Sequence, residues 1–202
     1  QSVLSQKFKT LSTEANKDHL LEVTSALLKI NPSYKKIILE LGGLMGEMDF
    51  YNSLIQPKVA IVTRIAPPSY TFVGLDEVTN EANKLLSRLP SDGIAILDWD
   101  GVTSKKLSKE IKASVIYYGT DPQNCTVWAG NVKIENFKPT FELNLGVERA
   151  KIGLPILGIH QIYPALAAAA LGIVYDIPLT KIKIALEGTP PQDHKMQLLF
   201  GP

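Results

Sequence analysis

The sequence predicts an α/β fold: a mostly parallel, doubly wound sheet with a small antiparallel β meander. In the first half of the chain, short apolar runs alternate with segments whose apolar residues recur at helical spacing. This is expected of parallel strands buried beneath helices on both faces. From about residue 125 to 155, apolar and polar residues alternate one by one, which is typical of antiparallel strands with one solvated face.

The order of the elements follows from these two patterns. The expected strands of the parallel part cover residues 9–12, 37–41, 59–63, 94–97 and 115–118, and the second of them is expected to be buried. The expected helices cover residues 19–30, 47–55, 75–89, an alanine-rich segment after Gly158, and 179–186, which Pro178 and Thr180 introduce. Strands that alternate with helices in this way indicate βαβ units.

Composition narrows the class of protein. The chain has 202 residues, enough for one domain with a substantial core. Its 21 basic and 20 acidic residues form no long run of one sign, which argues against a nucleic-acid partner. The single Cys125 excludes an internal disulfide, and no Cys/His cluster suggests zinc. No apolar stretch reaches the ~20 residues of a membrane span, so a cytoplasmic protein without membrane insertion is expected.

The alanine-rich segment from Gly158 to Gly172 is the most unusual part of the sequence. A helix face made of Ala165, Ala168, Ala169 and Gly172 offers little side chain, so a neighbouring element is expected to approach closely. The polar residues before the helix would lie at its N-terminus, where free N–H groups and the dipole favour negative charge. Two interpretations stay open: a helix beside a nucleotide or phosphate pocket, and an ordinary buried helix.

Polar residues also follow the predicted parallel strands, at the edge where ligands collect in such sheets. They are Glu40, Thr63-Arg64 with Ser69, and Asp98 with Asp100. Glu40 lies among leucines, where a carboxylate is costly unless it is paired or metal-bound. It is expected either to bind Mg²⁺ or to cap the next helix. Asp98 and Asp100, in the sequence Asp-Trp-Asp-Gly, are expected to form a turn rather than a catalytic pair.

A series of short motifs occurs in a characteristic order. The motifs are Lys9-Thr-Leu-Ser-Thr-Glu-Ala-Asn16, Ile38-Leu-Glu-Leu-Gly42, Gly46-Glu47, Pro57-Lys-Val-Ala-Ile-Val-Thr63, Ala66-Pro67, Gly74-Leu75 and the stretch from Gly158 through His160 to Ala170. Together they resemble the central, ATP-binding domain of the Mur ligases, in particular the D-alanyl-D-alanine-adding members. The resemblance covers nearly the whole chain and implies a P-loop NTPase-like fold.

The resemblance also implies an activity and partners. Mur ligases use ATP to phosphorylate a carboxylate of a UDP-muramoyl peptide, and an amine then attacks the acyl phosphate to form an amide. The implied cofactors are ATP and Mg²⁺, and the implied partners are a UDP-muramoyl-peptide-type substrate, an amine and the remaining domains of a longer ligase.

The family pattern also suggests where the domain begins and ends. Residues 1–188 are expected to form the central domain, with its antiparallel subsheet at about 125–155, and residues 189–202 to be a linker toward an absent C-terminal domain. The family's P-loop is expected upstream of Gln1, so the chain alone is expected to be inactive.

The resemblance assigns roles to six positions. They are Glu40 and Ser69 for the metal, His160 and Gln161 for the nucleotide, and Thr13 and Asn16 for the substrate. Three positions depart from the family pattern. Ser69 stands where the family has a metal-ligating histidine, Ala82 where many members have a carbamylated lysine, and Pro164 where they have a second asparagine. Lys84 is two positions further along the predicted helix, about 200° around its axis, so it cannot replace that lysine.

Three functions are compatible with these patterns. The first is the central domain of an ATP-dependent acid–amino-acid ligase of peptidoglycan precursor synthesis. The second is a catalytically degenerate Mur-ligase-like scaffold or regulatory domain, because the departures fall on metal and nucleotide positions. The third is an unrelated doubly wound module that binds another small ligand and shares only the fold.

Overall fold

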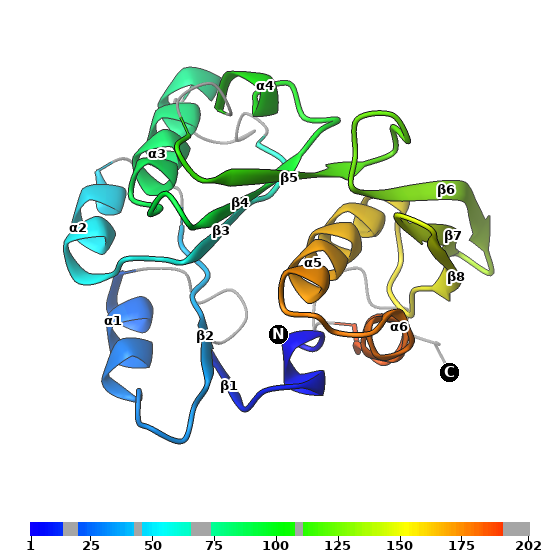
Figure 1. Cartoon of the computed structure of the whole chain (residues 1–202), viewed down its shortest axis with the longest axis horizontal. Helices are drawn as coiled ribbons and strands as arrows, with labels where there is room; N and C mark the ends of the chain where they lie inside the picture. The colour runs from blue at the N-terminus through cyan, green and yellow to red at the C-terminus, as the bar shows by residue number, and fades with distance from the viewer. Residues whose placement is uncertain (14–19, 43–45, 66–73, 108–110, 192–202) are drawn as a thin grey trace, which may run out of the picture.

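The structure is a computed structural model that describes residues 1–13, 20–42, 46–65, 74–107 and 111–191. It contains a six-stranded sheet in the order β3-β4-β5-β6-β7-β8 and a separate two-stranded sheet, β1-β2 (Figure 1). The strands are β1 (Thr10–Ser12), β2 (Lys36–Ile38), β3 (Val59–Val62), β4 (Ile94–Asp98), β5 (Ser114–Gly119), β6 (Val127–Glu135), β7 (Lys138–Leu145) and β8 (Glu148–Gly153).

The helices cover the sheets and connect their strands (Figure 1). They are η1 (Leu4–Gln6), α1 (Leu20–Leu28), α2 (Glu47–Leu54), α3 (Leu75–Ser87), α4 (Ser104–Leu107), η3 (Ile159–Gln161), α5 (Ile162–Val174) and α6 (Leu179–Glu187). Within the described ranges, no helix is both long and apolar enough to cross a membrane.

The predicted fold class is confirmed by the pairing of the strands. β3, β4, β5 and β6 are paired in parallel, and their registers align Val59 with Ile94 and Tyr118 with Val127. β6, β7 and β8 are paired antiparallel and form the expected meander. Parallel strands need crossover connections and antiparallel ones only short turns, and the sequence pattern changes at this boundary for that reason.

The expected buried strand at residues 37–41 is wrong in length and in burial. β2 ends at Ile38, and Ile37 is 41% exposed. The apolar residues that follow, Leu39 and Leu41, pack instead against a small cluster of α1 and α2 side chains that includes Tyr51. β2 belongs to a separate two-stranded sheet rather than to the main sheet, and all three of its residues are half-buried or exposed.

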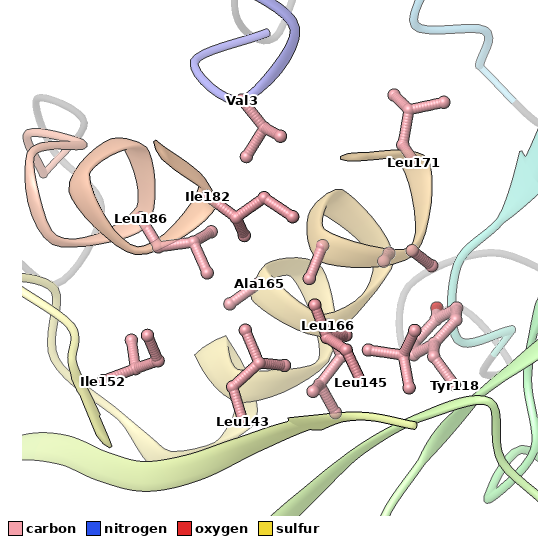
Figure 2. Packing of buried hydrophobic residues seen from close by; sticks show 14 of the residues in the cluster. Val3, Tyr118, Leu143, Leu145, Ile152, Ala165, Leu166, Leu171, Ile182 and Leu186 are labelled. Carbon is pink, nitrogen blue, oxygen red and sulfur yellow. The ribbon is translucent and has the colours of Figure 1, made fainter. Parts of the chain in front are cut away.

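The alanine-rich helix α5 lies in the centre of the largest apolar cluster. It packs on β4, β5, β6 and β7 on one side and on α6 on the other. Figure 2 shows the sheet side chains Leu143 and Leu145 below Ala165 and Leu166 of the helix, and Ile182 of α6 above them. Ala169 has no exposed surface and Ala165 only 5%. The small residues therefore let α5 contact both layers at once.

Gly172 is the point of closest approach on this helix. A Cβ atom there would lie 2.8 Å from Cδ1 of Ile182 and 3.0 Å from Cγ1 of Val3. Both distances are shorter than a normal carbon–carbon contact of about 3.5–4.0 Å. The close approach expected from the sequence is therefore confirmed, and the atoms that approach belong to the side chains of Ile182 on α6 and of Val3, the residue before η1.

We predict that Gly172→Leu separates α5 from α6. Overpacking of this kind typically destabilises a protein by about 1–3 kcal/mol. Leucine is a better helix former than glycine, but this gain is only about 0.8 kcal/mol, so the net effect is a loss of stability. Urea unfolding should therefore show a lower free energy of unfolding. As a control, Thr180→Leu adds the same side chain at an exposed position of α6 and should change stability by no more than about 0.5 kcal/mol. Equal effects of the two variants would contradict the packing described here.

Candidate functional site

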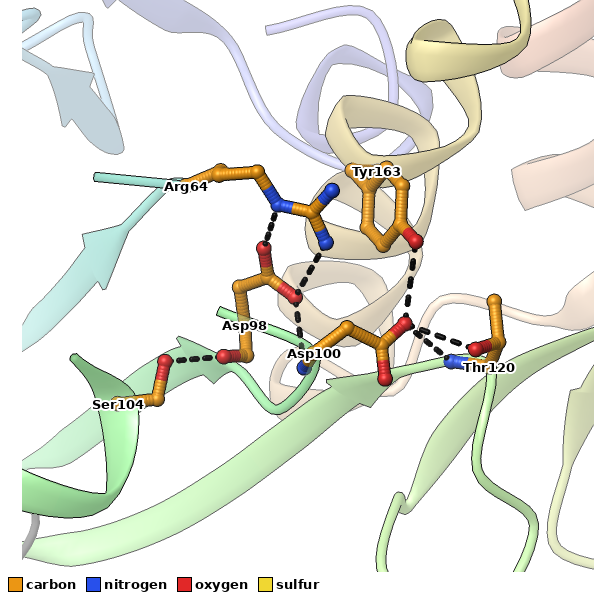
Figure 3. A network of polar contacts seen from close by, with 6 residues as sticks. All are labelled: Arg64, Asp98, Asp100, Ser104, Thr120 and Tyr163. Carbon is orange, nitrogen blue, oxygen red and sulfur yellow. Dashed lines mark hydrogen bonds and ion pairs between the residues drawn. The ribbon is translucent and has the colours of Figure 1, made fainter. Parts of the chain in front are cut away.

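The carboxyl ends of three parallel strands meet the first turn of α5 (Figure 3). Arg64 follows β3 by two residues, Asp98 is the last residue of β4, and Thr120 comes directly after β5. Tyr163 is the second residue of α5. Because parallel strands end at the same edge of a sheet, residues distant in sequence are brought together there.

Arg64 and Asp98 form an ion pair at this edge. Nε of Arg64 lies 2.8 Å from Oδ2 of Asp98, and Nη2 lies 3.4 Å from Oδ1. The side chain of Asp98 is 1% exposed and that of Arg64 is 41% exposed. Burial lowers the pKa of Arg64, but hydrogen bonding to Asp98 opposes this and the pKa is raised overall, so the guanidinium stays charged.

Asp98 also organises the turn that follows β4. Its Oδ1 accepts a hydrogen bond of 3.1 Å from the backbone N–H of Asp100. Its backbone oxygen accepts the N–H of Gly101 at 3.2 Å and the hydroxyl of Ser104. The turn expected for Asp-Trp-Asp-Gly is therefore confirmed, with the carboxylate of its first residue facing inward.

Asp100 connects this turn to β5 and α5. Its Oδ2 accepts hydrogen bonds from the N–H and the hydroxyl of Thr120, both at 2.9 Å, and from the hydroxyl of Tyr163 at 3.2 Å. The guanidinium carbon of Arg64 lies 3.7 Å from the centroid of the Tyr163 ring, in a cation–π contact. Arg64, Asp98, Asp100 and Tyr163 thus form a closed set of contacts, which we call the polar clamp.

Two further groups near the clamp are held in their neutral forms. Burial raises the pKa of the Tyr118 hydroxyl, and the charge of Asp98 adds to this effect. Within the described part of the chain, this buried hydroxyl has no hydrogen-bond partner. Burial also raises the pKa of the Cys125 thiol to about 12, so this thiol is not a candidate nucleophile at neutral pH.

The residues predicted from the sequence fall into two separate pairs. Oγ1 of Thr13, which is 9% exposed, accepts the backbone N–H of Glu40 at 3.0 Å. Nε2 of Gln161 lies 3.2 Å from Nε2 of His160. Among the described residues, no hydrogen bond or ion pair joins one pair to the other, and the side chain of Glu40 is exposed without a partner. The predicted Asn16 and Ser69 lie outside the described residues.

Two of the three positions that depart from the family pattern, Ala82 and Pro164, lie on helices of the described part of the chain. Ala82 is half-buried on α3 and packs against an apolar cluster under β3 and β4. Lys84 points instead toward α2, with Nζ 2.6 Å from Asp49 and 2.9 Å from Glu81. Pro164 is exposed on α5. An open hollow of about 410 Å³ lies beside Lys84, lined by Asp49, Asn52, Ser53, Lys84, Ser87 and Arg88, and contains none of the predicted site residues.

The sequence profile of the Mur ligase middle domain matches residues 1–172 of this chain. The chain belongs to the Mur ligase family. Sequence similarity to individual members supports this: the UDP-N-acetylmuramoyl-tripeptide–D-alanyl-D-alanine ligase of Buchnera aphidicola (subspecies Baizongia pistaciae) is 30% identical over 200 residues. The corresponding ligase of Escherichia coli K12 is 30% identical over 188 residues. An unrelated module that shares only the fold is therefore excluded.

The match covers a part of these relatives. The two comparisons cover 98% and 92% of this chain, but only 44% and 42% of the two relatives. The chain thus spans less than half the length of the relatives.

Solved structures show the same fold. A crystal structure of MurF from Acinetobacter baumannii has a TM-score of 0.89 at 22% identity, over 99% of this chain and 44% of that one. MurF from Thermotoga maritima in complex with ADP has a TM-score of 0.79 at 12% identity, over 95% of this chain and 44% of that one.

We predict that Asp98→Asn destabilises the domain. Removing the charge of Asp98 leaves the charge of Arg64 without a partner. Because Arg64 is partly solvated, we expect the free energy of unfolding to fall by only about 1–3 kcal/mol. Asp92→Asn is a matched control, because Asp92 pairs with Lys58 on the surface, where both side chains are more than half exposed, and such pairs contribute about 0–1 kcal/mol. Thermal or urea unfolding measures both variants. A loss for Asp98→Asn no greater than for Asp92→Asn would contradict the burial described here.

Proposed function

We propose that this chain is the central domain of a longer, cytoplasmic ATP-dependent acid–amino-acid ligase. The reaction would join an amine to a UDP-muramoyl peptide through an acyl phosphate. The observation that carries the proposal is the similarity, over nearly the whole chain, to relatives named UDP-N-acetylmuramoyl-tripeptide–D-alanyl-D-alanine ligases. Because the chain spans less than half of those relatives, we assign the activity to the longer protein and to this domain the contacts with ATP.

Glu40 is the residue proposed to hold Mg²⁺, together with Ser69. Its carboxylate is exposed and has no partner among the described residues, so it is free to bind a cation. The described residues contain no group of three His, Cys, Asp or Glu side chains that could hold a metal ion. Glu40 and Ser69 together supply only one carboxylate. Such a site suits an ion that keeps several waters and also binds a nucleotide, as Mg²⁺ does. The ion would neutralise charge on the phosphates during transfer.

His160 and Gln161 are proposed to contact the nucleotide. The exposed His160 ring and the amide of Gln161 lie in the turn before α5 and offer donors and acceptors to a base edge. On the substrate side, Thr13 already uses its hydroxyl oxygen to hold the N–H of Glu40. The hydroxyl keeps its own proton to donate, so we assign Thr13 contact with the muramoyl peptide, together with Asn16, in addition to its support of Glu40.

A catalytically degenerate scaffold is the second candidate. The polar clamp places one arginine and two aspartates at the carboxyl edge, so this part of the edge is net negative. A net negative charge disfavours phosphate groups nearby. Lys84 is held by Asp49 and Glu81 and does not offset this charge. A scaffold would keep the apolar framework of the fold and bind no nucleotide.

Calorimetric titration with ATP and Mg²⁺ distinguishes these candidates, using the longest available form of the protein. We predict that the wild type binds Mg²⁺–ATP. Glu40→Gln should raise the Kd about tenfold or more, because a metal-binding carboxylate is lost. Glu148→Gln, at an exposed position of β8, is the control and should leave the affinity unchanged. No heat at about millimolar ATP would reject the ligase domain in favour of the scaffold. Binding that Glu40→Gln leaves unchanged would remove Glu40 from the site.

A further inference from the structure

The first turn of α5 has no side-chain cap of its own. Gln161 occupies the N-cap position and makes no capping hydrogen bond with its side chain. Gly158, at φ +95°, opens the turn with a backbone conformation that favours glycine. Among the described residues, the side chains of His160 and Gln161 hydrogen-bond only to each other. The turn itself contacts β7, but among the described residues its polar side chains form no hydrogen bond to the sheet, so directional contacts are left to the residues that follow it.

The apolar side of α5 sets how close the helix lies to the sheet, and Ile162 and Ala165 in its first turns are buried. Apolar contacts are non-directional, so they do not orient the polar groups of the turn that precedes the helix. Tyr163 adds two directional contacts. Its hydroxyl donates to Asp100 at 3.2 Å, and its ring lies 3.7 Å from the guanidinium carbon of Arg64. These contacts come from two different strand ends and together determine where the first turn lies.

The other two contacts of the clamp make it rigid. Arg64 is held by the nearly unexposed Asp98, and Asp98 Oδ1 also accepts the N–H of Asp100. Each of the four residues contacts two others, so Tyr163 cannot shift without breaking or straining a contact (Figure 3). Arg64 is suited to this role because its planar guanidinium can pair with a carboxylate and stack on an aromatic ring at the same time.

We propose that Arg64 and Tyr163 are positioning residues for the nucleotide site. They hold the turn that carries His160 and Gln161 at a fixed place over the carboxyl edge of the sheet. Arg64 does not itself bind phosphate, because Asp98 already neutralises it. This inference rests on the proposed function, in which that turn contacts the adenine base. Displacements of about 1 Å are enough to weaken such contacts, so the clamp controls affinity without touching the ligand.

Two conservative variants test the clamp. Tyr163→Phe keeps the ring and removes the hydroxyl, and Arg64→Lys keeps the charge and removes the planar group. Tyr175→Phe is a matched control: it removes the same hydroxyl at the other end of α5, where the described residues give that hydroxyl no hydrogen bond. All three are compared with the wild type in the longest available form of the protein.

The first readout is amide hydrogen exchange, resolved by peptide. We expect exchange of residues 159–166 to rise about fivefold in Tyr163→Phe and Arg64→Lys, the factor expected from one lost hydrogen bond. Exchange in β5 and α6 should change less, and Tyr175→Phe should leave residues 159–166 unchanged. Unaltered exchange of that segment in both clamp variants would overturn the proposal.

The second readout compares Mg²⁺–ATP with Mg²⁺–tripolyphosphate, which lacks the base. The proposal requires ATP to bind about fivefold more weakly to both clamp variants and tripolyphosphate to bind as in the wild type. Equal losses for the two ligands would indicate general structural damage and overturn the positioning role, as would unchanged ATP affinity. A wild type that binds no ATP would instead reject the proposed function, and the exchange data alone would then decide whether the clamp holds the turn.

Discussion

The small side chains of α5 allow one helix to contact the main sheet and α6 simultaneously. With Gly172 within reach of Ile182 and Val3, and Ala169 fully buried, the helix axis can lie close to both layers. Protein interiors are packed at the density of organic crystals, so this spacing cannot be widened without opening cavities. The meander strands, η1 and α6 share one apolar cluster with α5, so their packing depends on how closely this helix approaches them.

The same helix brings polar groups to the carboxyl edge of the sheet. Apolar packing sets the distance between α5 and the sheet, and the polar clamp at the first turn of α5 sets where along the sheet edge the helix begins. The clamp also gives this edge its charge: Arg64 is matched by Asp98, and Asp100 leaves a net negative group beside Tyr163. A nucleotide at this edge would consequently need a cation nearby to offset this charge.

The sequence pattern predicted the elements of the main sheet well, because β3, β4 and β5 are made of short apolar runs, and β4 at the centre of the parallel part is buried along nearly its whole length. It overestimated the length of the strand predicted at residues 37–41. Leu39 and Leu41 pack against side chains of α1 and α2, so their apolar character does not indicate a strand. The clamp was missed for a different reason. The turn of Asp98 and Asp100 is local and visible in sequence, whereas the pairing of Arg64 with Asp98, 34 residues later, depends on strand register. In the sequence, Tyr163 is one residue of a helix expected to be buried, and no pattern indicates which residues it contacts.

Photolabelling with an azido-adenine analogue of ATP tests the account most directly. With Mg²⁺ present and the longest available form of the protein, the label should attach within residues 158–163, and excess ATP should abolish it. Peptide mass spectrometry locates the label. Labelling instead beside Lys84 and Arg88, in the hollow between α2 and α3, would contradict the account, as would labelling of residues 158–163 that excess ATP does not reduce.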